Sequence, residues 1–437
     1  MGCGGTDVYN APRAIGLPLQ AEGACTAAAS GRFTPFNTYS NDVSPAGIFS
    51  FAPMKKLFAA LAATVLSISA LSASAQSLPP PTIAAKSWLL LDASANQVIA
   101  SSDPDMRVEP ASLTKLMTAY LAFAALRDKR LNAEQEVNVS VNAWKVDPSS
   151  SKMFIEPNKP VSINNLLFGL ISVSGNDAAV AVAEAVSGTE DAFVQLMNRE
   201  AQRQGLTNTR FSNPHGLPSP DTYTTARDLS ILCRNLINDF PEYYKTYYSV
   251  KKFTYNNITQ PNRNRLLWLD PTVDGMKTGH TSSAGYSLIT SAHRPVPNGE
   301  RRLISVVIGT VSDQVRTQES QKILNWGFQN FDAVKLYAKG QPVDTPDVWK
   351  GSQGKIKVGF KQDVYITIPK GTAEKVKTHL DRNDPLIAPI SENAKVGTLK
   401  VTIDDKLVTE LPVVALESVG PAGFIGRAWD SLRLMFK

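Results

Sequence analysis

A hydroxyl and an amine three residues apart are the first candidates for chemistry in this chain. Ser112 and Lys115 follow Pro110, and the apolar residues from 113 to 124 recur at the spacing of a helix with one buried face. Pro110 suits the first turn of such a helix. Residues three apart are neighbours on a helix surface, so the two polar groups can reach each other. This is the arrangement of a nucleophile and its base.

The spacing alone carries little weight. Ser149 with Lys152 and Ser352 with Lys355 show the same pattern. At ordinary Ser and Lys frequencies, roughly one or two chance matches are expected in a chain of this length. A helix start with a solvated lysine therefore explains any single match equally well. Further partners must decide between the two interpretations.

A second polar motif, Ser174-x-Asn176, lies between two predicted helices. The apolar residues 164–171 predict the first, and the Ala-rich stretch 178–186 begins the second. Ser-x-Asn also occurs at Ser140 and Ser162. This motif too is weak when it is taken alone.

The third motif, Lys277-Thr278-Gly279, occurs once, in a stretch that predicts an edge strand. Its ammonium and hydroxyl can meet a carboxylate, and Gly279 lets a ligand backbone approach closely. Such an edge can hold a peptide as an added strand. A simple polar hairpin is the alternative interpretation.

The composition indicates an ordinary globular chain of about two domains. It has 437 residues, of which 43% are hydrophobic and 19% charged, and a formal net charge of +6. Basic and acidic residues are interspersed, so we expect no nucleic-acid partner. The four histidines lie singly and show no metal-ligand spacing, so we expect neither a metal nor an organic cofactor. Cys233 lies in an apolar helical pattern and is expected to be a buried thiol.

Residues 54–75 have the pattern of a secretory signal peptide. A basic pair precedes a short apolar run and a small-x-small site, Ala73-Ser74-Ala75. A signal peptide acts at the N-terminus, so we expect Met54 to be the true start and residues 1–53 to be a non-native extension. The mature protein would be exported.

Residues 76–334 predict an α+β or sandwiched α/β domain. Strands are expected at 87–92, 96–100, 252–255, 287–292 and 303–309, with helices between them up to about residue 240. Residues 335–417 instead predict a small all-β domain, because short alternating segments recur at 355–360, 363–368, 386–390 and 397–416.

The chain ends in a predicted amphipathic helix, residues 420–437. Its apolar face carries Ile425, Trp429 and Leu432, and most of its charged residues elsewhere are basic. This pattern predicts an anchor lying on an anionic membrane surface. A helix packed on its own domain is the alternative.

The three motifs, in this order in an exported protein, resemble the penicillin-binding protein and serine β-lactamase fold. More closely, the mature chain resembles the low-molecular-weight penicillin-binding proteins of the D-alanyl-D-alanine carboxypeptidase family, peptidase S11. Further segments resemble the sequences of this family, namely residues 110–118, 174–178, 213–217, 223–228 and 273–281. Class A β-lactamases carry a deacylating Glu beyond Ser-x-Asn. Here residues 208–213 contain no carboxylate.

The resemblance implies that Ser112 attacks the penultimate D-alanine of a peptidoglycan pentapeptide and forms an acyl-enzyme, with β-lactams as inhibitors. Lys115 would be the base, with a pKa lowered by burial and by Lys277. Ser174 would relay a proton, and Asn176 would hold the substrate amide. The N–H groups of Ser112 and His280 would form the oxyanion hole.

The same resemblance implies cations for the substrate's terminal carboxylate. Lys277 is the local cation and the Thr278 hydroxyl a local hydrogen-bond donor, and Arg263 and Arg316 are implied to join them. His215 is expected to have a structural role. Residues 309–313 differ from the sequence expected for the family at this position.

The location implied is the periplasm, with the last helix holding the protein at the outer face of the cytoplasmic membrane. Two alternatives stay open. One is a slowly acylating penicillin-binding scaffold, and the other is β-lactamase or endopeptidase activity at the same residues.

Overall fold

The computed structural model describes residues 79–296 and 299–435. The predicted N-terminal extension and signal peptide lie outside the described residues.

The first domain is built on a five-stranded antiparallel sheet in the order β2-β1-β9-β8-β7. The strands are β1 (Ser87–Asp92), β2 (Gln97–Ser102), β7 (Val273–Thr281), β8 (Gly285–Val296) and β9 (Gly299–Thr310). The chain's first and last strands of this domain therefore meet in the middle of the sheet. The predicted strand 252–255 is present as β5 (Lys252–Tyr255), but it pairs only with β6 (Ile258–Pro261), outside the main sheet.

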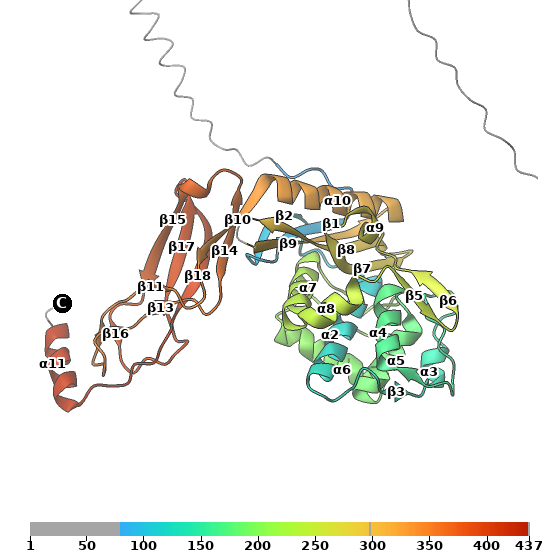
Figure 1. Cartoon of the computed structure of the whole chain (residues 1–437), viewed down its shortest axis with the longest axis horizontal. Coiled ribbons are helices and arrows are strands. Elements are labelled where there is room, and N and C mark those ends of the chain that lie inside the picture. The colour runs from blue at the N-terminus through green and yellow to red at the C-terminus, as the bar shows by residue number, and fades with distance from the viewer. Residues whose placement is uncertain (1–78, 297–298, 436–437) are drawn as a thin grey trace, which may run out of the picture. The chain divides into compact units, whose positions relative to one another are not determined.

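Both faces of the sheet are covered, which explains the unbroken apolar run of β1. Leu89 and Leu91 point into one hydrophobic cluster, whereas Trp88 and Leu90 point into the other. Alternation along a strand sends successive side chains to opposite faces. On the Trp88 side the cover is α10 (Asp313–Asn330), as Figure 1 shows.

A group of helices covers the other face (Figure 1). They are α2 (Lys115–Arg127), α4 (Ile163–Ser172), α5 (Asn176–Ser187), α6 (Glu190–Arg203), α7 (Ala226–Asp239) and α8 (Pro241–Tyr248). Shorter elements join them: the 3₁₀ turn η1 (Ala111–Thr114), β3 (Glu136–Val137), α3 (Val141–Trp144), β4 (Val161–Ser162) and α9 (Leu266–Leu269). The layered α/β architecture predicted from the sequence is confirmed.

The second domain is all β, as predicted, with its own core. Its main sheet has the order β11-β13-β18-β17-β15. Its elements are β10 (Phe331–Tyr337), β11 (Pro342–Asp344), β12 (Val348–Trp349), β13 (Val358–Gly359), β14 (Val364–Pro369), η2 (Ala373–Lys375), β15 (Val376–Arg382), β16 (Leu386–Ile387), β17 (Lys395–Ile403) and β18 (Lys406–Ala415). Asp404 and Asp405 form the turn between β17 and β18, and both have positive φ, which a two-residue hairpin turn requires.

The last described element is α11 (Phe424–Leu434), and its apolar residues are uncovered. Ile425 is 83% exposed and Trp429 is 61% exposed, and no residue of the helix is buried. Asp430 accepts a hydrogen bond of 2.6 Å from the Lys350 N–H. Among the described residues, no helix is long and apolar enough to cross a membrane.

Candidate active site

The nucleophile turn differs from the predicted helix in one respect. Ser112 lies on the 3₁₀ turn η1, and the α-helix α2 begins only at Lys115. The difference has a chemical consequence, because positions three apart eclipse each other in a 3₁₀ turn. Lys115 Nζ lies 3.0 Å from Ser112 Oγ.

Lys115 is 1% exposed, and its amine lies within hydrogen-bond distance of three oxygen atoms, Ser112 Oγ among them. Its Nζ donates to Asn176 Oδ1 and to the His215 carbonyl oxygen, each at 2.7 Å. A neutral amine has two N–H groups and one lone pair. When the amine is protonated, it donates to all three oxygens; when it is neutral, these two acceptors use both N–H groups and the lone pair faces the Ser112 hydroxyl.

Burial is the main reason why the pKa of Lys115 is lowered to about 7, and the positive charge of Arg263 lowers it further. The carboxylate of Asp177 acts in the opposite direction. The lowered pKa agrees with the sequence prediction, and Arg263 is a further cation that the prediction did not name. Burial, and then the charge of Lys115, place the pKa of Lys277 well below its ordinary range.

A second serine and lysine pair lies in the same site. Lys277 Nζ donates to Ser174 Oγ at 2.8 Å and to the Thr278 carbonyl at 3.1 Å. Ser174 has φ of +64°, a conformation that costs energy for a residue other than glycine and that is typical of functional sites. Two of the three predicted motifs therefore meet directly in the folded chain.

Strand β7 is an edge of the main sheet and approaches the nucleophile turn closely. A Cβ at Gly279 would lie 3.1 Å from the Pro110 carbonyl oxygen, so a larger residue would push the strand away from η1. His280, the next residue of β7, has an exposed ring that stacks on Tyr286 with centroids 3.9 Å apart.

The two predicted arginines have different surroundings. Arg316 is buried and donates to the carbonyls of Gly279 and Ser287 at 3.2 and 3.3 Å, and also to the carboxylate of Asp313. Arg263 lines the same cleft, and its guanidinium makes no hydrogen bond within the part of the chain that the structure describes. Arg263 is therefore the cation left available to a ligand.

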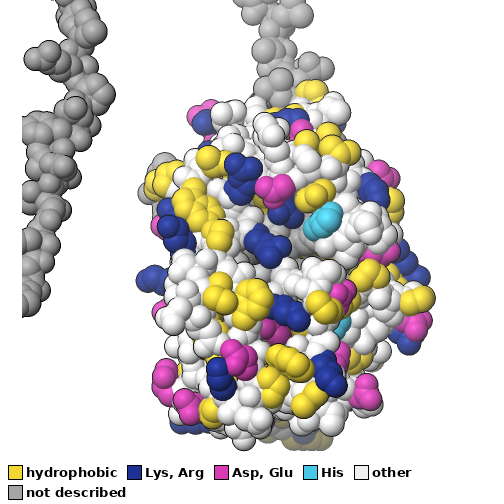
Figure 2. All heavy atoms as spheres, turned by 90° about the vertical axis from the view of Figure 1, so that its right-hand side faces the viewer, with side chains coloured by type: hydrophobic (Ala, Val, Ile, Leu, Met, Phe, Trp, Pro, Cys, Tyr) yellow, Lys and Arg dark blue, Asp and Glu magenta, His cyan; other side chains and the backbone are white. Residues whose placement is uncertain are grey.

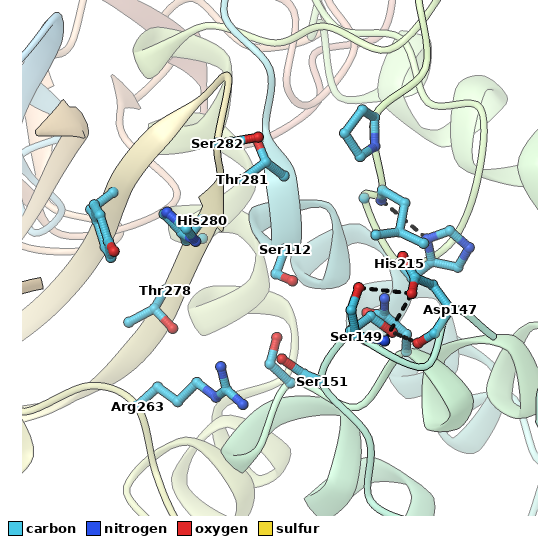
Figure 3. Close-up of a pocket in the computed structure, with 18 of the residues that line it drawn as sticks. Ser112, Asp147, Ser149, Ser151, His215, Arg263, Thr278, His280, Thr281 and Ser282 are labelled. Atoms are coloured by element: carbon cyan, nitrogen blue, oxygen red, sulfur yellow. Dashed lines mark hydrogen bonds between the residues drawn. The ribbon is translucent and has the colours of Figure 1, made fainter. Parts of the chain in front are cut away.

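These residues surround a cleft of about 460 Å³. Figure 3 shows Ser112 pointing into it, with Thr278 and Arg263 on one side and His215 on the other. Figure 2 shows Lys and Arg side chains around the hollow in the middle of one face of the molecule. In the described part of the chain, no group of three His, Cys, Asp or Glu side chains is arranged to hold a metal ion.

His215 is neutral near pH 7. Burial and then the charge of Lys115 lower its pKa to about 3. Its Nδ1 accepts a hydrogen bond of 3.1 Å from the Leu217 N–H, so this nitrogen cannot also take a proton from a substrate. The contacts favour the structural role expected from the sequence.

The sequence reasoning missed one wall of the cleft, the loop 147–155. Asp147 and the three serines 149–151 line it, and the Ser151 carbonyl accepts from the Asn176 N–H at 2.7 Å. Asp177 holds the loop, because its carboxylate accepts from the N–H groups of residues 153, 154 and 155 at 2.9, 2.8 and 3.3 Å. In the sequence, the acidic residue directly after Asn176 was the one sign that another segment is bound at this position.

Replacing Asp177 by alanine should lower the free energy of unfolding by about 3 kcal/mol, since buried N–H groups lose a charged acceptor. It should also slow acylation of Ser112 by loosening the cleft wall. Denaturant unfolding measures the first effect. Asp128→Ala is the control, because that carboxylate is exposed and pairs only with surface arginines. Equal stability of the two variants would contradict the expectation.

A serine beside a buried lysine of lowered pKa, with a second serine and lysine pair across the cleft, defines the penicillin-recognising class of serine acyltransferases. Comparison with known proteins agrees. The family model for D-alanyl-D-alanine carboxypeptidase, peptidase S11, matches residues 73–312. The model for the C-terminal domain of penicillin-binding protein 5 matches residues 331–421.

Individual relatives match most of this chain and nearly all of their own length. D-alanyl-D-alanine carboxypeptidase DacA of Haemophilus influenzae is 42% identical over 386 residues, covering 86% of this chain and 97% of the relative. The crystal structure of penicillin-binding protein 5 from the same organism covers 78% of this chain and 99% of its own, with a TM-score of 0.74 and 42% identity. Penicillin-binding protein D2 of Listeria monocytogenes, solved with cefotaxime bound, covers 57% of this chain and 100% of its own at 27% identity and a TM-score of 0.52.

The chain belongs to the D-alanyl-D-alanine carboxypeptidase family, peptidase S11, as its motifs predict. Membership favours serine carboxypeptidase activity over the scaffold and β-lactamase alternatives.

Proposed function

We propose that this protein removes the terminal D-alanine from peptidoglycan pentapeptides through an acyl-enzyme on Ser112. The observation that carries the proposal is the 3.0 Å contact of Ser112 Oγ with a buried Lys115, whose lowered pKa lets the neutral amine accept the hydroxyl proton. Ser112 Oγ attacks the carbonyl of the penultimate D-alanine and gives its proton to Lys115. Ser174 then passes a proton to the departing amine, and its contact with Lys277 supports this role. Water then hydrolyses the ester.

The terminal carboxylate of the substrate meets the Thr278 hydroxyl and the guanidinium of Arg263. A β-lactam offers the same pair of groups, a reactive carbonyl and a nearby carboxylate. Cefotaxime is bound in the Listeria relative. We therefore extend the proposal to β-lactams, which would acylate Ser112 and leave slowly.

Release of free D-alanine tests the activity. The purified mature chain should release one D-alanine from a pentapeptide that ends in D-Ala-D-Ala, and none from the same peptide with an amidated C-terminus. No release, with labelled penicillin still attached to Ser112, would favour the scaffold alternative. Rapid β-lactam turnover without D-alanine release would favour a β-lactamase.

We also propose that the protein works in the periplasm, held at the outer face of the cytoplasmic membrane by α11. The signal-like residues 54–75 support export. The exposure of Phe424, Ile425 and Trp429 supports the anchor, because apolar side chains of this size are seldom left together in water. Arg427 and Arg433 add attraction to anionic lipids.

Changing Ile425 and Trp429 to aspartate should reduce binding to vesicles rich in phosphatidylglycerol by at least tenfold, on the order of what loss of two apolar anchors predicts. Sedimentation with vesicles measures the binding. Leu407→Asp is the control, because Leu407 is an exposed apolar residue of the β domain outside α11. Unchanged sedimentation of the double variant would contradict the anchor.

A further inference from the structure

Arg263 stands between two asparagines that are almost wholly buried. Asn262 is 6% exposed and Asn264 is 1% exposed, whereas Arg263 itself is exposed. The segment connects β6 to α9. Carboxamides at this depth need hydrogen-bond partners, because an unpaired buried amide is costly.

Both carboxamides bind main-chain groups. Asn264 Nδ2 donates to the Gly275 carbonyl at 3.0 Å, and its Oδ1 accepts from the Leu266 N–H at 3.1 Å. Asn262 Nδ2 donates to the Val250 carbonyl at 2.9 Å, and its Oδ1 accepts from the Asn264 N–H at 2.9 Å. The main chain is therefore fixed on each side of Arg263, and Gly275 ties it to β7.

The charges around Arg263 explain why its position must be imposed. Besides burial, the positive charge of Arg263 lowers the pKa of Lys277, Arg316 and Lys115. The carboxylate of Asp313 is the counter-charge that acts on Arg263. Like charges repel, and the guanidinium has no hydrogen bond among the described residues to hold it at the cleft. Without a fixed main chain, Arg263 would turn toward solvent.

We propose that Asn262 and Asn264 are positioning residues that hold Arg263 ready for the terminal carboxylate of the substrate. The inference rests on the proposed carboxypeptidase function. It identifies the residues that give the enzyme its preference for a substrate with a free C-terminal carboxylate. Holding the cation in place before binding removes an ordering cost from the association step.

A double-mutant cycle tests the assignment. On the high-pH plateau of the acylation profile, Arg263→Ala should raise KM for the pentapeptide by about 30-fold, and Asn264→Ala by about 10-fold, with small changes in kcat. If Asn264 acts through Arg263, the double variant should be no worse than Arg263→Ala. Multiplicative effects of the two changes would overturn the proposal.

Asn198→Ala is the matched control. Asn198 Nδ2 donates to the carbonyls of Val194 and Phe211 at 3.0 and 2.8 Å, and its Oδ1 accepts from the Phe211 N–H at 2.9 Å. It is not among the residues that line the active-site cleft. Its loss should lower the melting temperature and leave KM unchanged. A tenfold rise of KM in this variant would overturn the proposal, since a general loss of stability would then suffice.

Asn262→Ser provides a second variant if Asn264→Ala fails to fold, with the same expected dependence on Arg263. The rate of Ser112 acylation by labelled penicillin is measured in every variant. If wild type releases no D-alanine, the proposed function fails. The positioning role is then tested by the same double-mutant cycle, measured on the rate of penicillin acylation. Non-additive effects of Arg263→Ala and Asn264→Ala would support it, and additive effects would overturn it.

Discussion

Replacing Ser112 by alanine is expected to reduce D-alanine release by about 10⁴- to 10⁶-fold, as loss of the nucleophile does in other serine acyl-transfer enzymes. The same change should abolish covalent labelling by penicillin. Ser112 Oγ contacts Lys115 Nζ at 3.0 Å, and the variant removes only this small polar group at the mouth of the site. The fold should therefore survive. D-alanine release and mass spectrometry of the penicillin-treated protein measure the two effects.

Ser352→Ala is the control for this change. Ser352 and Lys355 repeat the spacing of Ser112 and Lys115, but they lie in the all-β domain rather than in the cleft. Full activity and labelling are expected. Labelled penicillin on the Ser112→Ala protein would show that another residue carries the acyl group.

The centre of the site was predictable because its residues are linked by short-range geometry or by their order. Ser112 and Lys115 are three apart, and a single turn of helix brings them together. Ser174 and Lys277 depend on tertiary contacts, and only the shared order of the motifs predicted their meeting. Even so, the local conformation differed, since η1 is a 3₁₀ turn.

The remaining wall of the cleft could not be predicted, because it is set by long-range contacts of irregular segments. The loop 147–155 has no periodic pattern, and it takes its position from the carboxylate of Asp177. Ser149 and Lys152 were a chance match by spacing, yet Ser149 lies in the cleft wall. The spacing alone therefore shows neither that a serine is a nucleophile nor that it lies outside the site.

In the fold, too, local patterns were predictable and long-range pairing was not. Residues 87–92 were predictable as a strand because both faces are buried, and 397–416 as two strands because alternation and an Asp-Asp turn agree. The pattern at 252–255 was also right as a strand. Its partner was not predictable, since pairing with β6 rather than the main sheet depends on tertiary packing.

Acylation by the wild-type protein is expected to rise with pH to a plateau, with a midpoint near pH 7. The base must be neutral, and the pKa of Lys115 lies at about 7 rather than 10.5. About half of the molecules then have a neutral amine at pH 7, against roughly 1 in 3,000 for an unshifted lysine. The rate of penicillin acylation between pH 5.5 and 9 measures the profile. Lys115→Ala should lower the plateau by about 10³-fold and remove this limb.

Arg263→Gln tests whether the group whose deprotonation limits acylation lies near the charge of Arg263. The positive charge of Arg263 lowers the pKa of Lys115, so its removal should move the midpoint of the acylation profile to higher pH. Weaker binding of the carboxylate lowers the height of the curve but does not move its midpoint. Arg263 also lowers the pKa of Lys277, so the midpoint shift shows that a lysine near Arg263 limits acylation, and loss of the limb in Lys115→Ala assigns it to Lys115. A midpoint that stays in place, or moves to lower pH, would mean that Lys115 is not the group whose deprotonation limits acylation.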